Sequence, residues 1–138
     1  LCDLLTGQEQ ILFPDARHRA STIEMVDLSK IVDVAVIDEV QMVASPDRGW
    51  AWTRALLGLP ARELHVCGEA RTLPLLRQLC ELCGDELEVN HYQRLPPLAV
   101  SGRSLSSSLA NVRPGDCVVA FSRKSIHELK KDIELQTP

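Results

Sequence analysis

The sequence predicts an α/β fold in which helices flank a parallel β-sheet. Short apolar segments alternate along the chain with segments whose apolar residues recur at helical spacing, and this order favours β/α units with right-handed crossovers. Val34–Ile37 is an apolar run without alternation, which is typical of a strand that helices bury on both faces. The 138 residues are 45% hydrophobic, which is enough for one small domain with a core.

Seven segments are predicted as strands because apolar and β-branched residues are frequent in them and turn residues bound them. In chain order they are Cys2–Leu5, Ala20–Met25, Asp33–Ile37, Glu63–Cys67, Leu87–Tyr92, Leu98–Val100 and Cys117–Phe121. Pro14-Asp15 predicts a loop before the second strand, and Arg113-Pro114-Gly115-Asp116 predicts a turn before the last.

The first predicted helix begins at Ser45-Pro46-Asp47, which offers a capping hydroxyl, a proline in the first turn and an acid near the positive end of the helix dipole. Gly58 and Pro60 stop this helix. The residues that recur at helical spacing within it are Trp50, Thr53, Arg54 and Leu57. We expect Trp50 and Trp52 to be packing aromatics, because they lie in an apolar helical pattern.

Two further helices are predicted. One begins at Thr72-Leu73-Pro74 and ends at the C-cap Gly84. Its apolar face is formed by Leu75, Leu76, Leu79, Cys80 and Cys83, and we expect the Cys80–Cys83 pair to pack rather than to bind zinc. The other begins with the capping-box pattern of Ser125 and Glu128. The apolar face of this last helix is formed by Ile126, Leu129 and Ile133.

The overall charge and the lengths of the apolar runs argue against two classes of function. A formal net charge of −4 disfavours nucleic-acid binding through bulk positive charge, but it leaves room for a groove of backbone amides and a few cations. No apolar run approaches the roughly 20 residues of a membrane-spanning helix. The chain begins at Leu1 in an expected strand rather than a leader peptide, so it reads as part of a longer polypeptide.

The adjacent carboxylates Asp38 and Glu39 follow the buried strand directly. Ligand sites of parallel sheets lie at the carboxyl ends of their strands. One carboxylate there can hold a hydrated Mg²⁺ beside the phosphates of a nucleotide, and its neighbour can orient or deprotonate the attacking water. The alternative is a surface acidic pair that merely closes a core strand.

The order of the loops resembles one family. Along the chain stand Leu5-Thr6-Gly7, Thr22-Ile23-Glu24-Met25, Asp38-Glu39-Val40-Gln41, Arg48-Gly49, Gly68-Glu69-Ala70 and Val118–Ser122. This succession resembles the DExH-box branch of superfamily-two RNA helicases, and in particular the mitochondrial ATP-dependent RNA helicases of the RNA-degradosome family. The resemblance covers nearly all of the chain. It implies a RecA-like parallel sheet, with residues 1–100 as the later part of the first motor domain and residues 101–138 as the linker and the first β/α unit of the second.

The resemblance also implies roles for the nucleotide-side residues. Asp38 is expected to bind Mg²⁺, and Glu39 is expected to activate the water that attacks ATP. Gln41 is expected to link ATP hydrolysis to the RNA-side motifs. The segment Gly68-Glu69-Ala70 takes the place of a Ser-Ala-Thr-type coupling motif, so the hydroxyls of that motif are absent here.

RNA contacts are implied for a second set of residues, namely Thr6, Gly7, Thr22, Glu24, Ser122, Arg123 and Lys124. The implied reaction is ATP hydrolysis coupled to 3′-to-5′ movement on RNA and duplex separation. The implied setting is RNA turnover in the mitochondrial matrix, on single strands or duplexes with a 3′ overhang. The implied partner is an exoribonuclease such as polynucleotide phosphorylase, and no membrane is expected as a partner.

The phosphate-binding loop of such a motor is absent from these 138 residues, because no Gly-Lys-Ser or Gly-Lys-Thr sequence occurs in them. In the family, this loop lies upstream and the arginine finger lies downstream of the segment present here. We therefore expect the isolated polypeptide to be inactive. The alternative is a noncatalytic interaction or regulatory module derived from the helicase fold. A kinase-like enzyme would not account for Gln41 or for Thr22-Ile23-Glu24 in their present order.

Overall fold

A computed structural model describes residues 1–93, 95, 98–102, 104–105 and 108–136. The chain divides into two compact units, Leu1–Val89 and Asn90–Pro138. The domain boundary expected between residues 100 and 101 stays a prediction. It falls at the start of a serine-rich stretch, of which Arg103, Ser106 and Ser107 lie outside the described residues. In the part of the chain that the structure describes, no helix is both long and apolar enough to cross a bilayer.

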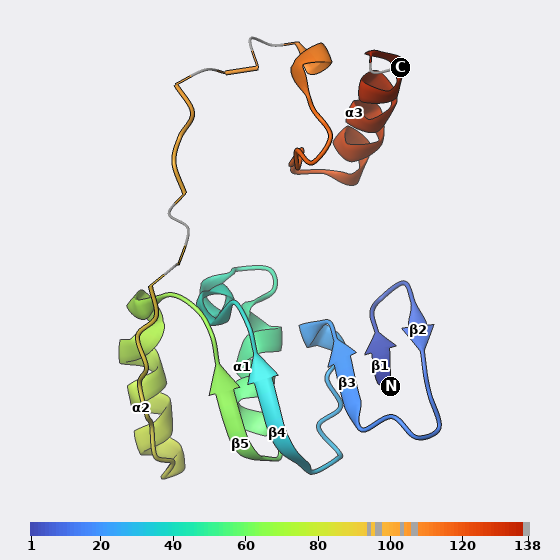
Figure 1. Ribbon diagram of the computed structural model, residues 1–138. Coiled ribbons are helices and arrows are strands. Elements are labelled where there is room, and N and C mark those ends of the chain that lie inside the picture. Colours follow the sequence, from blue (N-terminus) through green and yellow to red (C-terminus); the bar gives the residue numbers. More distant parts are fainter. Residues whose placement is uncertain (94, 96–97, 103, 106–107, 137–138) are drawn as a thin grey trace. The chain divides into compact units, whose positions relative to one another are not determined.

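The first unit is an α/β structure built on parallel strand pairs, as predicted (Figure 1). Strand β1 (Cys2–Leu5) pairs in parallel with β3 (His18–Ser21), and β4 (Val32–Ile37) pairs in parallel with β5 (Ala61–Val66). The two-residue strand β2 (Gln10–Ile11) runs antiparallel to β1. It was not predicted, because two residues carry no readable alternation. The strands β1, β3, β4 and β5 point the same way, so their carboxyl ends lie on the same side of this unit (Figure 1).

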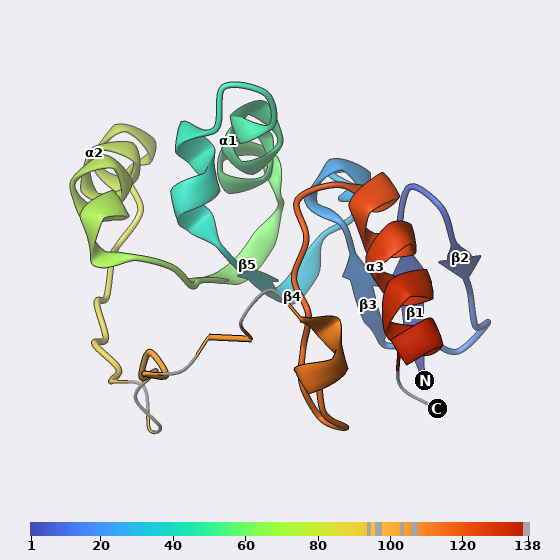
Figure 2. The same cartoon turned by 90° about the horizontal axis from the view of Figure 1, so that it is seen from above.

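The core lies between the β4–β5 pair and helix α1 (Gly49–Gly58). Its buried members are Ile37, Ala51, Trp52 and Ala55, and the half-buried Leu64 packs against them. Helices α1 and α2 (Leu73–Cys83) lie on the same side of the two strands (Figure 2). The prediction that the Val34–Ile37 run is buried on both faces was wrong. Val34 is 54% and Val36 is 66% exposed, because no described helix covers the other face.

Several strand predictions were also wrong. The predicted strand Ala20–Met25 ends at Ser21 and is followed by a 3₁₀ turn, η1 (Ile23–Met25), in which the N–H of Met25 donates to the carbonyl of Thr22. The segments 87–92, 98–100 and 117–121 contain no strand in their described residues. A strand is defined by its hydrogen bonds to a neighbour, and none of these segments has one in the described chain.

Helix α1 begins at Gly49 and not at Ser45, because a second 3₁₀ turn, η2 (Val40–Ala44), occupies the segment after the acidic pair. Ser45 starts the turn that leads into the helix: its Oγ accepts the N–H of Arg48 at 3.3 Å. The buried face of α1 also differs from the face that the helical spacing predicted. Trp52 is buried, but Trp50 is 56% exposed, so Trp50 is not a core aromatic in this unit.

The other two helices agree better with their predictions. Helix α2 begins after Thr72 and ends at Gly84, which adopts the left-handed conformation with φ of 77°. Cys80 is half-buried on this helix, whereas Cys83 is exposed and does not pack as expected. Helix α3 (Arg123–Gln136) belongs to the second unit, which also contains the 3₁₀ turn η4 (Leu109–Asn111). Ser122 and not Ser125 caps α3, since the Oγ of Ser122 accepts the N–H of Ser125 at 3.1 Å.

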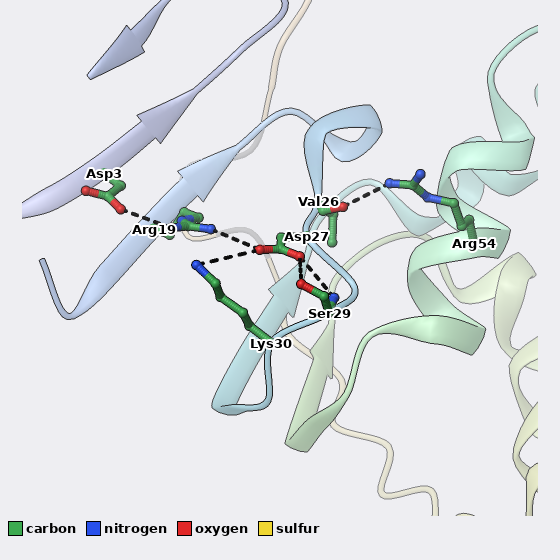
Figure 3. Close-up of polar contacts among 7 residues, drawn as sticks. All are labelled: Asp3, Arg19, Val26, Asp27, Ser29, Lys30 and Arg54. Carbon is green, nitrogen blue, oxygen red and sulfur yellow. Dashed lines mark hydrogen bonds and ion pairs between the residues drawn. The ribbon is translucent and has the colours of Figure 1, made fainter. Parts of the chain in front are cut away.

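A polar network joins β1 and β3 to the segment between η1 and β4 (Figure 3). The buried carboxylate of Asp3 accepts the N–H of Phe13 at 3.0 Å and an N–H of Arg19 at 3.3 Å. The same guanidinium lies 3.6 Å from Asp27, which also lies 3.9 Å from the ammonium of Lys30. These bonds lower the pKa of Asp3 from its ordinary value of 3.8, the N–H of Phe13 more than Arg19.

We predict that Asp3→Asn lowers the stability of this unit at neutral pH. Since the folded pKa of Asp3 lies below its unfolded pKa, the stabilisation is present above the unfolded pKa and is lost as the pH falls through the folded one. Urea unfolding followed by tryptophan fluorescence measures this, because both tryptophans of the chain lie in α1. The gap between the urea midpoints of wild type and variant should therefore narrow as the pH falls below about 4.

The control is Asp33→Asn, which removes an exposed carboxylate 3.5 Å from Arg62. Exposed ion pairs contribute little to stability, so its urea midpoint should match that of the wild type. A midpoint for Asp3→Asn equal to that of the wild type at pH 7 would contradict the role of the network.

Candidate functional site

The carboxylates of Asp38 and Glu39 lie at the carboxyl end of β4, and both residues are exposed. Glu39 has φ 55° and ψ 43°, and it is the non-glycine residue with positive φ among those described. Its N–H donates to Oδ1 of Asp38 at 2.8 Å. A left-handed conformation is costly for a residue with a side chain, and such strain clusters at functional sites. The sharp turn keeps both carboxylates at the edge of the sheet.

Gln41 joins the acidic pair to the loop that follows β5. Its Nε2 donates to Oε2 of Glu39, and its Oε1 accepts the N–H of Glu69 at 3.2 Å. Backbone bonds support this bridge: the N–H of Cys67 donates to the carbonyl of Ile37 at 2.8 Å, and the N–H of Val40 donates to the carbonyl of Cys67 at 3.0 Å. The side chain of Gln41 therefore uses its donor and its acceptor on two different loops.

Gly68 is required by the close approach of these two loops. A Cβ placed on Gly68 would lie 2.6 Å from Oε1 of Gln41 and 2.7 Å from Cγ1 of Val40. The backbone nitrogen of Val40 would lie only 3.0 Å away. The glycine of the predicted coupling segment therefore has a packing role, and Glu69 contributes its backbone N–H rather than a hydroxyl.

The loops after β1 and β3 lie next to each other. Leu5 and Ser21 are partners in the parallel register, and the N–H of Thr22 donates to the carbonyl of Leu5 at 3.0 Å. The hydroxyl of Thr6 is used within its own turn, where its Oγ1 accepts the N–H of Glu9 at 2.9 Å. Gly7 is exposed beside it. Two predicted RNA-contacting segments thus lie together at the carboxyl ends of β1 and β3, which point the same way as the carboxyl end of β4 that carries the acidic pair (Figure 1).

Glu24 has a charged protein partner. Its Oε1 lies 2.8 Å from one terminal nitrogen of Arg48 and accepts the Nε–H of the same side chain at 2.9 Å. The pKa of Glu24 is lowered, first by a hydrogen bond from its own backbone N–H and then by Arg48. The carboxylate is therefore ionised at neutral pH and would repel a phosphate. Its expected RNA contact stays a prediction, and the geometry favours an indirect role.

Arg48 and Trp52 form contacts that could not be found from the sequence. The guanidinium carbon of Arg48 lies 5.3 Å from the centroid of the Trp52 ring. The indole Nε1–H of Trp52 donates to the backbone carbonyl of Asp38 at 2.9 Å. From its place in the sequence, Arg48 could equally be a solvated residue at a helix start. No spacing rule relates it to Glu24, which lies on a different element.

Ser122, Arg123 and Lys124 lie in the second unit, at the start of α3. Ser122 caps the helix, and the ammonium of Lys124 lies 3.8 Å from the carboxylate of Glu128 in an exposed pair. All three are exposed, so they are accessible to a ligand. Their role in RNA binding stays a prediction.

The chemistry of the acidic pair fits a Mg²⁺ ion held together with a nucleotide. Oδ1 of Asp38 accepts the N–H of Glu39, and among the described residues no hydrogen bond engages its Oδ2. Mg²⁺ in nucleotide sites keeps several waters and needs only one or two carboxylates besides the phosphates. In the described part of the chain, no group of three or more metal-ligating side chains forms a complete protein cage.

The fold and the site together define an α/β unit with an acidic pair at the carboxyl end of a parallel strand, where ligands of such sheets bind. The family profile of the DEXQ-box helicase domain of Suv3 matches residues 1–92. Three relatives match nearly the whole chain. They are the mitochondrial DExH-box ATP-dependent RNA helicase DExH18 of Arabidopsis thaliana, the mitochondrial ATP-dependent RNA helicase SUV3 of Saccharomyces cerevisiae and the mitochondrial ATP-dependent RNA helicase SUPV3L1 of Homo sapiens.

The identities to these three proteins are 52%, 45% and 46%, over 99%, 99% and 98% of this chain. The chain belongs to the Suv3 family of DEXQ-box helicase domains. It spans 18%, 19% and 18% of the lengths of these relatives. The fourth letter of the family box corresponds to Gln41, the residue that bridges the two loops.

We predict that Gly68→Ala destabilises the first unit by about 1–3 kcal/mol, because the added methyl group must displace Gln41 or Val40. Urea unfolding followed by tryptophan fluorescence measures the free energy. The matched control is Gly7→Ala, since nothing lies within 4 Å of the position of its Cβ, and its change should stay within about 0.5 kcal/mol. Equal stabilities of the two variants would contradict the packing of these loops.

Proposed function

We propose that this chain is a segment of a mitochondrial ATP-dependent RNA helicase and supplies one wall of its nucleotide site together with part of its RNA site. The observation that best supports this proposal is the pair of hydrogen bonds by which Gln41 links Glu39 to the loop after β5, in a chain of the DEXQ-box helicase family. The printed names of the relatives, mitochondrial ATP-dependent RNA helicases, support ATP as the nucleotide, RNA as the ligand and the mitochondrion as the location.

On the nucleotide side, the carboxylate of Asp38 would hold a hydrated Mg²⁺, while its Oδ1 accepts the N–H of Glu39. The metal would neutralise charge on the phosphates of ATP. Glu39 orients the attacking water and accepts its proton on a carboxylate oxygen. Gln41 keeps the carboxylate of Glu39 in place, since its amide donates to Oε2. Positioning and charge neutralisation carry most of phosphoryl transfer, so few protein groups are needed on this wall.

On the RNA side, the loops at Thr6-Gly7 and Thr22 contact the phosphate backbone of a single strand through small residues that allow its close approach. In the second unit, the exposed residues Ser122, Arg123 and Lys124 are further candidates for contact with RNA. Contacts of this kind read no base sequence, which suits a motor that moves along any RNA.

The wider function follows from the same assignment. We infer 3′-to-5′ translocation with duplex separation on RNAs that carry a 3′ overhang. We also infer a role in RNA degradation in the mitochondrial matrix, with an exoribonuclease such as polynucleotide phosphorylase as partner. Complete turnover needs a phosphate-binding loop, which no sequence in these 138 residues supplies.

We predict that the purified 138-residue chain has no RNA-stimulated ATPase activity, whereas a longer helicase polypeptide that contains it does. In that longer polypeptide, Glu39→Gln should lower turnover by roughly 10²- to 10⁴-fold, as removal of a general base does. Steady-state phosphate release in the presence of Mg²⁺ and RNA measures this. The matched control is Asp33→Asn, since Asp33 is an exposed acid on the same strand whose carboxylate pairs only with Arg62 among the described residues.

Two results would contradict the proposal. Turnover by the 138-residue chain that Glu39→Gln abolishes would show that the site is complete without further elements. A longer polypeptide that binds neither ATP nor RNA would favour the alternative of a noncatalytic interaction module.

A further inference from the structure

The RNA-side turn η1 is held by helix α1 through two arginines. Arg48 precedes α1 and pairs with the carboxylate of Glu24 at 2.8 Å. Arg54, inside α1, donates to the backbone carbonyl of Glu24 at 3.2 Å. It also donates to the backbone carbonyl of Val26 at 2.9 Å (Figure 3). The carboxylate of Glu24 is thus bound by the N-cap residue of α1, and the carbonyls of Glu24 and Val26 are bound by a residue inside the helix.

Helix α1 also contacts the backbone of the acidic pair. The indole of Trp52 donates to the carbonyl of Asp38 at 2.9 Å, and Trp52 is only 7% exposed. The guanidinium of Arg48 lies against the same indole ring, 5.3 Å from its centroid, while it pairs with Glu24. A guanidinium over an indole ring is a favourable cation–π arrangement. Four groups therefore form one continuous chain of contacts: the carbonyl of Asp38, the indole of Trp52, the guanidinium of Arg48 and the carboxylate of Glu24.

We propose that Trp52, Arg48 and Glu24 are positioning residues that transmit changes at the backbone of Asp38 to the turn η1 and thereby to the adjacent RNA-contacting loop. The inference rests on the proposed function, because it names the residues that link its two sites. We call this set the Trp52–Arg48–Glu24 relay.

The orientation of the relay supports this role. Its first contact is to the carbonyl of Asp38, so the carboxylate stays available to the nucleotide. Its last contact reaches Glu24, which lies two residues after Thr22. The N–H of Thr22 donates to the carbonyl of Leu5, the residue before Thr6-Gly7. A shift at the end of β4 is therefore passed on to both RNA-side loops through bonded and stacked groups. Contiguous networks of this kind can carry coupling between sites.

The test measures coupling rather than activity alone, in a longer helicase polypeptide that contains this chain. The quantity is the coupling factor, defined as the ratio of the dissociation constants for a labelled single-stranded RNA without and with a non-hydrolysable ATP analogue and Mg²⁺. Binding coupling of this kind is reciprocal between the two ligands. We predict that Arg48→Gln moves the factor toward one by about threefold to tenfold.

Three further variants separate a positioning role from general damage to the fold. Trp52→Phe keeps an aromatic ring but removes the indole N–H that donates to the carbonyl of Asp38. It should move the coupling factor in the same direction. Glu24→Gln combined with Arg48→Gln should lose little more than Arg48→Gln alone, because both changes break one pair. The matched control Arg62→Gln breaks an exposed pair with Asp33 and should leave the factor at the wild-type value.

The outcomes distinguish the relay from the proposed function. A wild-type polypeptide that binds RNA with a coupling factor clearly different from one, together with unchanged factors in Arg48→Gln and Trp52→Phe, would overturn the relay alone. A lower melting temperature in these variants with an unchanged factor would likewise assign them a merely structural role. A wild-type polypeptide that binds no nucleotide or no RNA would overturn the proposed function and the relay with it.

Discussion

The parallel pairing of β4 with β5 is the constraint on which the site depends. Ile37 and Val66 are partners in this register, and the backbone bond from Cys67 to Ile37 extends the pairing by one residue. After the acidic pair, the N–H of Val40 donates to the carbonyl of Cys67, so the chain is again hydrogen-bonded to the residue that follows β5. The Asp38-Glu39 turn is thus closed by backbone bonds on both sides. Because the turn is so short, Glu39 takes the left-handed conformation.

This arrangement explains why side chains from separate loops converge at one edge. Parallel strands deliver all their carboxyl ends to the same side, so loops far apart in the chain become neighbours. Gln41 can therefore bond both the carboxylate of Glu39 and the backbone N–H of Glu69. Helix α1 packs its small residues Ala51 and Ala55 against β4, which brings the buried Trp52 close enough to bond the carbonyl of Asp38. The edge of the sheet and the helix behind it therefore form one connected structure.

The sequence predicted those features that local signals determine. Helix α2 carries a proline in its first turn and Gly84 as its left-handed C-cap, and both of its ends were predicted within a residue. The acidic pair was predicted at the end of a strand because an apolar run stops there. In contrast, the segment 117–121 has strand-like composition but no described neighbour to pair with. Strand formation depends on a partner, and composition cannot supply one.

Features that depend on tertiary packing could not be predicted in the same way. The apolar spacing of Trp50 and Leu57 indicated one face of α1, but the helix buries the face of Ala51, Trp52 and Ala55, because small residues allow the close approach to the sheet. The Arg48–Glu24 pair joins two elements that no periodicity relates. The resemblance to RNA helicases predicted Gln41 as a linking residue, but its two hydrogen bonds are seen only in the structure. Candidate site residues were therefore found from the sequence, whereas their partners were not.

The most direct measurement is a structure of a longer helicase polypeptide that contains this chain, with Mg²⁺, a non-hydrolysable ATP analogue and single-stranded RNA bound. We expect a water ligand of Mg²⁺ on Oδ2 of Asp38 and a water held by Glu39 in line with the terminal phosphate. We also expect the RNA backbone against the loops at Thr6 and Thr22. A nucleotide bound with both carboxylates turned away from its phosphates, or with the metal held by other residues, would contradict the account.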